Sequence, residues 1–281
     1  MKTNNIVLVP TDFSEVCDNA IHHGVELAKS LKYKVYLLHV IDKITKSDLK
    51  KENLTFEAVD EKLKEVASQY QEKFDLEVKY ISKEGSIFSI IPEVAEEIGA
   101  NIVVLGTHGK CGIQHLTGSY ALKIVTSSPC PVVVVQKRAF GKDGYKDIVF
   151  PIDDISEVRQ KVKWALHIAE TFKSRIHLYV IKSNDEYLQN KLRIVIKQIT
   201  EIFDRHNVEY VLESPEKTGN FAKEVISYAT AKEANLIMIM TNPDIFNFIL
   251  SPWDEQMIFN QSQIPVLCIN PVELNFIILQ M

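Results

Sequence analysis

Hydrophobic residues along this chain follow two alternating patterns. Short runs rich in Val, Ile and Leu are separated by longer segments in which apolar residues recur every three or four positions. The short runs predict β-strands and the longer segments predict amphipathic helices, an order typical of a parallel sheet covered by helices. Strands are expected near residues 5–10, 33–41, 76–82, 101–106 and 131–136, and again near 147–151, 175–181, 208–213, 235–240 and 265–269.

Local signals sharpen two of these elements. The helix before the fourth strand is expected to begin after Ser86, a suitable N-cap, and to end at Gly99. The nearly continuous apolar runs at 102–105 and 132–135 are typical of strands that are covered on both faces.

The sequence contains an internal repeat of one unit. The segment that begins at Ile6 returns in the segment that begins at Ile148, and Pro10 and Asp12 align with Pro151 and Asp153 at an offset of 141 residues. Later matches, such as Ala100–Thr107 with Ala234–Thr241, fall at an offset of 134. The second copy has therefore lost seven residues, and the deletion is placed between its second and third strands.

The repeat predicts two domains of similar size. We expect domain 1 at residues 1–138 and domain 2 at residues 145–272, because Gly141 and Gly144 lie among charged residues between the copies as a short linker.

Composition narrows the class of protein. With 46% hydrophobic and 25% charged residues, the chain can build sizeable cores, and its net charge of -5 and pI near 5.9 argue against a general grip on nucleic acid or an anionic membrane. Four widely spaced cysteines without a C-x-x-C motif suggest neither a metal site nor a disulfide framework. The absence of a window of about 18 apolar residues argues against a membrane helix. A cytoplasmic location is expected.

Candidate chemistry begins at the ends of strands, because ligands of open parallel sheets bind outside the carboxyl ends. The first strand ends in Pro10-Thr11-Asp12, followed by Ser14, whose hydroxyl is suited to capping the next helix. Two interpretations stay open: Asp12 and Ser14 only start that helix, or Asp12 also contacts a ligand. His39, at the end of the second strand, is expected to be a buried side chain whose hydrogen bonds are satisfied.

The fourth predicted strand runs into a glycine-rich loop, which reads Gly106-Thr107-His108-Gly109-Lys110-Cys111-Gly112 and continues to Gly118-Ser119 ahead of a helix. Glycines allow the backbone to approach a ligand closely, and amides at a helix N-terminus can hold an anion such as phosphate. The alternatives are a mobile loop and, for Lys110, an ordinary surface charge. The loop is neither G-x-x-x-x-G-K-[ST] nor G-x-G-x-x-G, so the mechanisms of those motifs are not transferred.

These features together carry a resemblance to a known family. They are Pro10-Thr11-Asp12-Phe13-Ser14 after the first strand, Gly106, Gly109 and Gly118-Ser119 after the fourth, and Ser128-Pro-Cys-Pro before the fifth. In this combination the chain resembles the universal stress protein family, and since the similarity covers both copies it is identified as a tandem two-domain member.

The resemblance implies a fold and a ligand. The fold is α/β, with two Rossmann-like (adenine nucleotide alpha hydrolase-like) domains, each a five-stranded parallel sheet of order 3-2-1-4-5 between helices, which pair through their fifth strands. One subgroup of the family binds ATP and another binds nothing identified. In matching positions, Asp12 and the Val40 backbone would hold adenine, while the glycine-rich loop would line ribose and phosphates, with Mg²⁺ as an accompanying ion. The full set of predicted nucleotide-binding residues is Pro10, Thr11, Asp12, Val40, Gly106, His108, Gly109, Lys110, Gly118 and Ser119.

The two copies depart from the family pattern to different degrees. The ATP-binding pattern is G-x2-G-x9-G-[ST], whereas eight residues separate Gly109 from Gly118. In copy two the corresponding positions are Met240, Pro243 and Pro252-Trp253, which remove backbone freedom and two N–H donors, so the same phosphate cradle cannot form there. The bulky residues of that loop, Phe246, Phe248, Ile249, Leu250 and Trp253, are expected to fill the cleft or to make a contact surface.

Three functional hypotheses follow. The leading one is a nucleotide-binding module in which copy one holds ATP and copy two is the partner in an intramolecular pseudo-dimer, with further association into a homodimer left open. The second is an interaction scaffold that binds no nucleotide. The third, ranked lowest, is a weak ATPase or phosphotransferase, for which His108 and Lys110 are the candidates that the loop offers.

Overall fold

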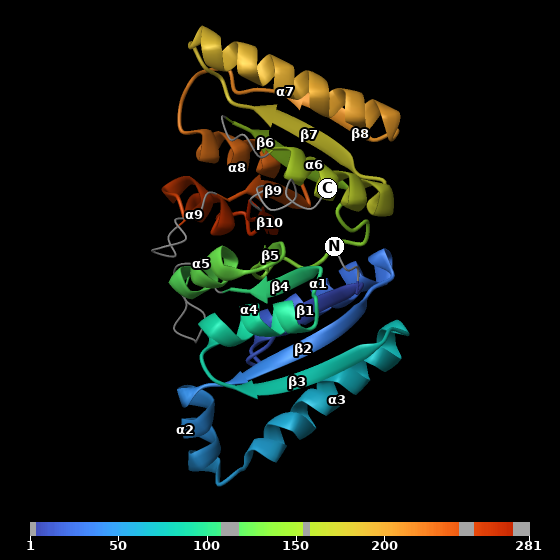
Figure 1. Ribbon diagram of the computed structural model, residues 1–281, viewed down its shortest axis with the longest axis vertical. Helices are drawn as coiled ribbons and strands as arrows, with labels where there is room; N and C mark the ends of the chain where they lie inside the picture. The colour runs from blue at the N-terminus through green and yellow to red at the C-terminus, as the bar shows by residue number, and fades with distance from the viewer. Residues whose placement is uncertain (1–3, 108–117, 154–157, 242–249, 272–281) are drawn as a thin grey trace, which may run out of the picture.

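The computed structural model describes residues 4–107, 118–153, 158–241 and 250–271, and the described strands form one sheet (Figure 1). In chain order the strands are β1 (Ile6–Pro10), β2 (Lys34–Ile41), β3 (Val78–Glu84), β4 (Ile102–Gly106), β5 (Val132–Val135), β6 (Asp147–Ile152), β7 (Arg175–Val180), β8 (Glu209–Glu213), β9 (Leu236–Met240) and β10 (Val266–Ile269). Their order across the sheet is β3-β2-β1-β4-β5-β10-β9-β6-β7-β8. Each half therefore has the predicted 3-2-1-4-5 order, and every predicted strand lies within two residues of its observed bounds.

Helices cover both faces of this sheet (Figure 1). They are α1 (Glu15–Leu31), α2 (Lys43–Glu52), α3 (Phe56–Phe74), α4 (Ile87–Glu97), α5 (Gly118–Ser127), α6 (Val158–Phe172), α7 (Glu186–Arg205), α8 (Phe221–Ala231) and α9 (Pro252–Ile258). Buried side chains of α1, α3, α6 and α7 form one core, and those of α4, α5, α8 and α9 form the other. The predicted signals around α4 are confirmed, because Ser86 accepts a hydrogen bond from the Phe88 amide and Gly99 adopts a positive φ of 63°.

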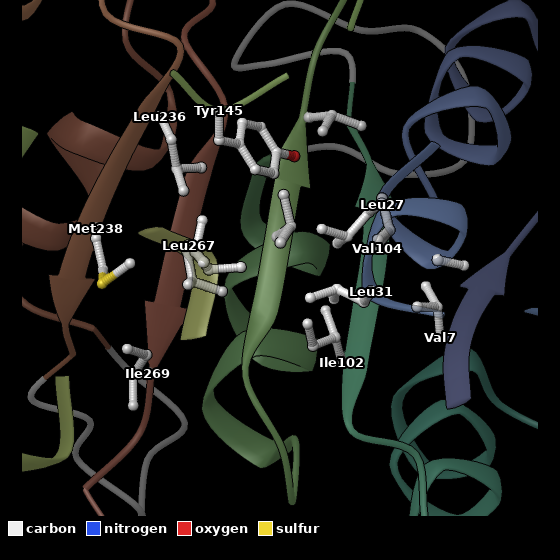
Figure 2. Packing of buried hydrophobic residues seen from close by; sticks show 14 of the residues in the cluster. Val7, Leu27, Leu31, Ile102, Val104, Tyr145, Leu236, Met238, Leu267 and Ile269 are labelled. Atoms are coloured by element: carbon white, nitrogen blue, oxygen red, sulfur yellow. The ribbon is translucent and has the colours of Figure 1, made fainter. Parts of the chain in front are cut away.

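Each core continues from one half into the other. Alternate residues of β1 supply the two cores, since Val7 and Val9 face one set of helices and Leu8 faces the other. Figure 2 shows Val104 of β4 and Leu267 of β10 within one continuous apolar layer. Both faces of the central strands are thus buried, as the unbroken apolar runs at 102–105 and 132–135 predicted for β4 and β5.

The two halves join through antiparallel pairing of β5 and β10, while the other strand pairs of the sheet are parallel. Val133 lies opposite Leu267, and these residues occupy equivalent positions in the two copies. A local two-fold relation therefore passes between them. The predicted pseudo-dimer through the fifth strands is confirmed.

Polar side chains repeat this two-fold relation beside the strands. Gln136 donates from Nε2 to the carbonyl oxygen of Asn260 at 3.1 Å. In the equivalent contact, Asn270 donates from Nδ2 to the carbonyl oxygen of Thr126 at 3.3 Å, and also to that of Val125 at 2.7 Å. Each half thus uses the residue after its fifth strand to satisfy carbonyl groups at the end of the other half's preceding helix.

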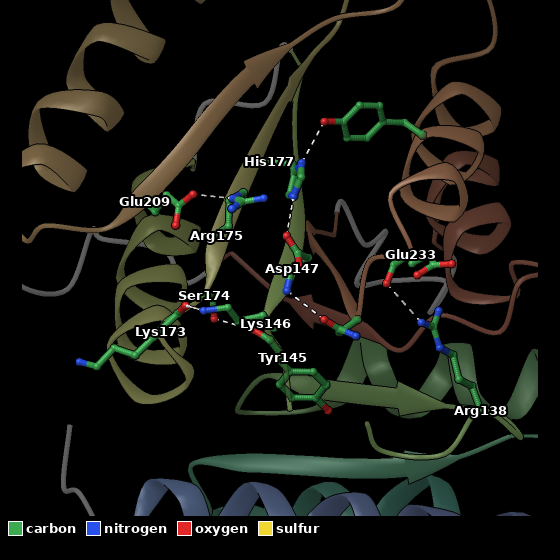
Figure 3. Close-up of polar contacts among 12 residues, drawn as sticks. Arg138, Tyr145, Lys146, Asp147, Lys173, Ser174, Arg175, His177, Glu209 and Glu233 are labelled. Atoms are coloured by element: carbon green, nitrogen blue, oxygen red, sulfur yellow. Dashed lines mark hydrogen bonds and ion pairs between the residues drawn. The ribbon is translucent and has the colours of Figure 1, made fainter. Parts of the chain in front are cut away.

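The segment between β5 and β6, which connects the two halves, packs against both of them. The His23 ring of α1 contacts the Arg138 carbonyl oxygen through Nε2 at 2.9 Å, and the Arg138 guanidinium donates to the Glu233 carbonyl oxygen at 3.4 Å (Figure 3). Tyr145 is almost fully buried and lies edge-on to Phe140. The charged composition of this stretch did not predict such burial.

The halves differ most between their second and third strands. In the N-terminal half, α2 and α3 connect β2 to β3, whereas α7 alone connects β7 to β8. This is where the repeat placed the seven-residue deletion. Across the described residues, no helix combines the length and apolar character needed to span a lipid bilayer.

The Asn270 contacts generate a stability prediction. Substitution Asn270→Ala leaves carbonyl groups at the end of α5 without their donors, so we expect the free energy of unfolding to fall by about 1–3 kcal/mol. Urea denaturation measures this change. The control Gln69→Ala removes an exposed amide and should change stability by less than about 0.5 kcal/mol. Equal effects of the two substitutions would contradict the role given to Asn270.

The buried His23 generates a pH prediction. Burial lowers the pKa of His23 to about 4, so between that value and its ordinary 6.5 the unfolded chain binds a proton that the folded chain does not. Stability is therefore fully present above pH 6.5 and declines as the pH falls toward 4, with His23 contributing roughly 3 kcal/mol of the loss. Denaturation of the native protein and of His23→Gln across this range measures the difference. Parallel stability profiles would refute it.

Candidate functional site

A cavity of about 290 Å³ opens at the carboxyl ends of β1 and β2. Its walls come from the turn after β1, the end of β2, the helix α2, the first turns of α3, and α4. Four predicted nucleotide-binding residues line it: Pro10, Thr11, Asp12 and Val40. The expectation that a ligand binds at the carboxyl ends of the strands therefore coincides with a cavity in the structure.

The turn after β1 is held by its own side chains. Thr11 accepts the Phe13 amide at Oγ1 (3.1 Å), and Asp12 accepts the Ser14 amide at Oδ1 (2.9 Å). Phe13 adopts a positive φ of 64°, which is unusual for a bulky residue, so these bonds maintain a strained turn. Ser14 occupies the N-cap position of α1, but its hydroxyl makes no capping hydrogen bond, so that part of the expectation is wrong.

The Asp12 carboxylate acts on the first turn of α1. It lies close enough to Cys17 that, with burial as the larger cause, its negative charge helps to raise the pKa of that thiol to about 12. Cys17 is therefore a neutral thiol at physiological pH and not a reactive one. Asp12 is itself half-buried at the cavity wall, where its charge can meet a ligand.

His39 connects the turn after β1 to α2. Its Nδ1 lies 2.8 Å from the Thr11 carbonyl oxygen, and its Nε2 lies 3.2 Å from the Thr45 hydroxyl. A carbonyl only accepts, which assigns the proton to Nδ1 and makes Nε2 the acceptor. Burial lowers the pKa of His39 and favours this neutral form. The expectation of a satisfied, buried histidine is confirmed, yet the residue also lines the cavity.

Sequence reasoning missed a stack of three side chains at the cavity wall. The Phe13 ring stacks on His39 with ring centroids 4.8 Å apart, and the Lys62 ammonium lies 4.3 Å from the Phe13 centroid. Lys62 is on α3, one helical turn after the buried Val59. That spacing was the only available signal, and it does not distinguish Lys62 from the other charged residues of the same helix.

The cavity combines apolar walls with a negative rim. Leu38, Leu49, Val59 and Ile91 are among its buried apolar residues. Among the described residues of the lining, the carboxylates of Asp12, Asp42, Asp48 and Glu52 outnumber the one lysine, Lys62. Such a site suits a flat, uncharged group with polar edges better than a bare phosphate.

The backbone at the end of β2 forms a tight turn. The Val40 carbonyl accepts the Asp42 amide at 2.9 Å, and the Asp42 side chain accepts the Ile44 and Thr45 amides at the start of α2. A carbonyl oxygen has two lone pairs, so the Val40 oxygen can still accept a bond from a ligand.

The predicted loop residues are only partly placed. Gly106 ends β4, beside β1, where an added Cβ would lie 2.9 Å from the Val16 carbonyl oxygen, so close packing of α1 explains this glycine. Gly118 and Ser119 begin α5. His108, Gly109 and Lys110 lie outside the described residues. No group of three or more potential metal ligands is found among the residues that the structure covers.

The corresponding end of the C-terminal half is built differently. Lys161, at the position of Ala20, is buried, donates to the Pro151 carbonyl oxygen and lies 4.1 Å from the Phe150 ring centroid. Burial lowers the pKa of Lys161 to about 8. A lysine side chain therefore fills space beside β6, and no described helix corresponds to α2.

Of the loop that follows β9 in the second copy, the structure describes only the C-terminal end. Leu250 is buried, and Trp253 packs against the same core with its ring stacked 6.0 Å from Phe221. The predicted positions Phe246, Phe248 and Ile249 lie outside the described residues. The two bulky residues that are placed therefore pack inward.

Comparisons with known proteins agree with this geometry. The model of the universal stress protein family matches residues 3–136. The universal stress protein MJ0531 of Methanocaldococcus jannaschii is 32% identical over 139 residues, which cover 47% of this chain and 81% of that protein. MJ0577 of the same organism is 32% identical, covering 47% and 94%. The chain therefore belongs to the universal stress protein family.

Solved structures match most of the chain, across both halves. A universal stress protein from Archaeoglobus fulgidus superposes with a TM-score of 0.76 at 16% identity and covers 95% of this chain and 99% of its own. One from Pseudomonas aeruginosa gives 0.65 at 13% identity, covering 96% and 94%. At these identities the likeness concerns the fold, and it shows that two such halves in one chain form a recurring architecture.

The Gly106 contact generates a prediction about stability. Substitution Gly106→Ala places a methyl group against the backbone of α1, so we expect a loss of about 1–3 kcal/mol in the free energy of unfolding. The matched control is Gly219→Ala, where the added Cβ meets only the Glu224 side chain at 3.8 Å. Thermal and urea denaturation of both variants check this, and an unaffected Gly106→Ala variant would show that the glycine is not required for packing.

Proposed function

We propose that the N-terminal half binds an adenine nucleotide, with ATP as the expected ligand, and that the C-terminal half supports it as a structural partner. The observation that carries this proposal is the cavity beside β1 and β2, whose lining includes Pro10, Thr11, Asp12 and Val40. Members of the universal stress protein family often bind ATP, which supports the same choice.

The proposed pose follows from the character of the lining. The adenine ring would lie between the apolar walls, with the Val40 backbone and the Asp12 carboxylate at its polar edge or on the ribose. The carboxylates of the rim would repel the phosphates, which would therefore extend toward Gly106 and the start of α5. There Gly118, Ser119 and the loop positions His108, Gly109 and Lys110 would receive them, together with Mg²⁺.

The proposal assigns different roles to the two halves. Residues 1–138 would form the binding domain and residues 145–272 the supporting domain. The buried Lys161 and the missing counterpart of α2 in the described residues support this division. Because β5 and β10 share one sheet, a change in the binding half can reach its partner, provided that the ligand binds two conformations with different affinity.

Binding, rather than turnover, is the function that we propose. His39 is engaged at both ring nitrogens and is not free to act as a general base. ATP hydrolysis that is lost in His108→Ala while ATP affinity is retained would instead support the weak ATPase.

The spacing between Gly109 and Gly118 favours a second candidate function. With one residue fewer than the ATP-binding pattern, the loop would not hold the phosphates, and the protein would act as an interaction scaffold. This alternative predicts no effect of ATP on stability, whereas binding would raise the melting temperature as the ATP concentration increases. Cytoplasmic location and association into a homodimer belong to both proposals.

Calorimetric titration with Mg-ATP tests the proposal. We expect saturable binding at one site per chain, weakened at least tenfold, equivalent to about 1.4 kcal/mol, in Asp12→Ala and in the double variant Gly109→Val/Gly118→Val. Asp153→Ala, the corresponding change in the C-terminal half, is the matched control and should leave the affinity unchanged. No detectable binding up to roughly millimolar ATP would exclude the nucleotide module and favour the scaffold.

A further inference from the structure

A hydrogen-bonded triad links two strands and a helix in the C-terminal half. His177 on β7 lies between Asp147 on β6 and Tyr228 on α8, with 3.0 Å from its Nε2 to Asp147 Oδ1 and 2.9 Å from its Nδ1 to the Tyr228 hydroxyl. Figure 3 shows His177 and Asp147 on neighbouring strands joined by this contact. His177 is only 4% exposed, whereas the Asp147 side chain is 29% exposed and Tyr228 is half-buried, so the imidazole is the member of the triad that is shielded from water.

The fold itself does not require this triad. In the N-terminal half the equivalent positions hold Ile6, Tyr36 and Val94, which build the same strands and helix without it. Burying a histidine and part of a carboxylate in a sheet is costly unless their bonds are satisfied. The C-terminal half therefore contains a hydrogen-bonded triad that the N-terminal half lacks.

An aromatic stack leads from the triad toward the surface. Tyr228 stacks on Tyr179 with centroids 4.5 Å apart, Tyr179 on Phe221 at 6.0 Å, and Phe221 on Trp253 at 6.0 Å. The interplanar angles are 30°, 11° and 19°, so the four rings are roughly parallel. Trp253 is half-buried at the start of α9.

The hydrogen bonds of His177 indicate which reaction the Tyr228 phenol can undergo. The imidazole donates Nε2–H to the Asp147 carboxylate, which leaves Nδ1 to accept the Tyr228 proton. Burial is the main reason that the pKa of Tyr228 rises to about 12, so the phenolate that a nucleophile requires is disfavoured. One-electron oxidation has a different requirement, because a phenol that loses an electron becomes strongly acidic and needs a proton acceptor already in place.

We propose that Tyr228 is a redox-active tyrosine, oxidised by one electron while its proton moves to His177. In this step the Tyr228 O–H bond breaks and an N–H bond forms at His177 Nδ1. The electron passes through Tyr179, Phe221 and Trp253 to a one-electron oxidant at the surface, such as a metal complex or an organic radical. The products are a neutral tyrosyl radical, an imidazolium ion and the reduced oxidant. Asp147 is a positioning residue that fixes the tautomer and balances the imidazolium charge.

Flash-quench oxidation of the full chain with a ruthenium(III) tris-bipyridyl complex tests this assignment. Electron paramagnetic resonance should detect a tyrosyl radical that Tyr228→Phe abolishes. His177→Phe should reduce its yield at least tenfold, because a positioned base contributes about a hundredfold or more to proton transfer. Trp253→Leu should slow its formation by interrupting the stack.

The matched control is Tyr33→Phe. Tyr33 also bonds to an imidazole, His167 Nε2 at 3.0 Å, but it belongs to the core on the opposite face of the sheet. This variant should keep the radical signal. In native protein containing deuterated tyrosine the signal should narrow, which shows without any substitution that a tyrosine carries the radical. A signal that survives in Tyr228→Phe, or an unchanged yield in His177→Phe, would overturn the proposal.

Discussion

The antiparallel pairing of β5 with β10 is the constraint on which the rest of this structure depends. In an isolated half the fifth strand would expose a row of unpaired backbone groups, and pairing the two fifth strands satisfies both rows at once. It also brings Val133 and Leu267 face to face and joins the two apolar layers across the molecule. The equivalent hydrogen bonds of Gln136 and Asn270, directly after β5 and β10, stabilise the same pairing of the two halves.

Within this symmetric frame, the chemistry of the two halves has diverged. The N-terminal half has α2, which forms one wall of the cavity and provides Thr45 as a partner for His39. The C-terminal half lacks a described counterpart, holds Lys161 against the end of β6, and has the Asp147–His177–Tyr228 triad instead. Because the strands and helices are shared, these differences arise from a few side chains and one helix, and not from the fold.

Sequence reasoning recovered part of the candidate site. It found Pro10, Thr11 and Asp12 because the carboxyl ends of parallel strands meet at one edge of a sheet, and it found Val40 through the family resemblance. It did not predict the contact between Phe13 and Lys62, which depends on how α3 crosses the end of β1. It assigned Gly106 to ligand approach, whereas the structure supplies a packing reason for that glycine at the backbone of α1.

The sequence by itself determined the repeat, the strands and the place of the seven-residue deletion, and the family resemblance that it carries implied the strand order and the pairing of the fifth strands. Alternation and apolar runs record which face of each element is buried, and the internal repeat together with the family resemblance carries the topology. Only the tertiary structure decided the cavity, the stack on His39, the packed linker around Tyr145 and the triad at His177. Each of these depends on side chains far apart in the chain that meet at specific angles, and hydrophobic periodicity holds no information on that geometry.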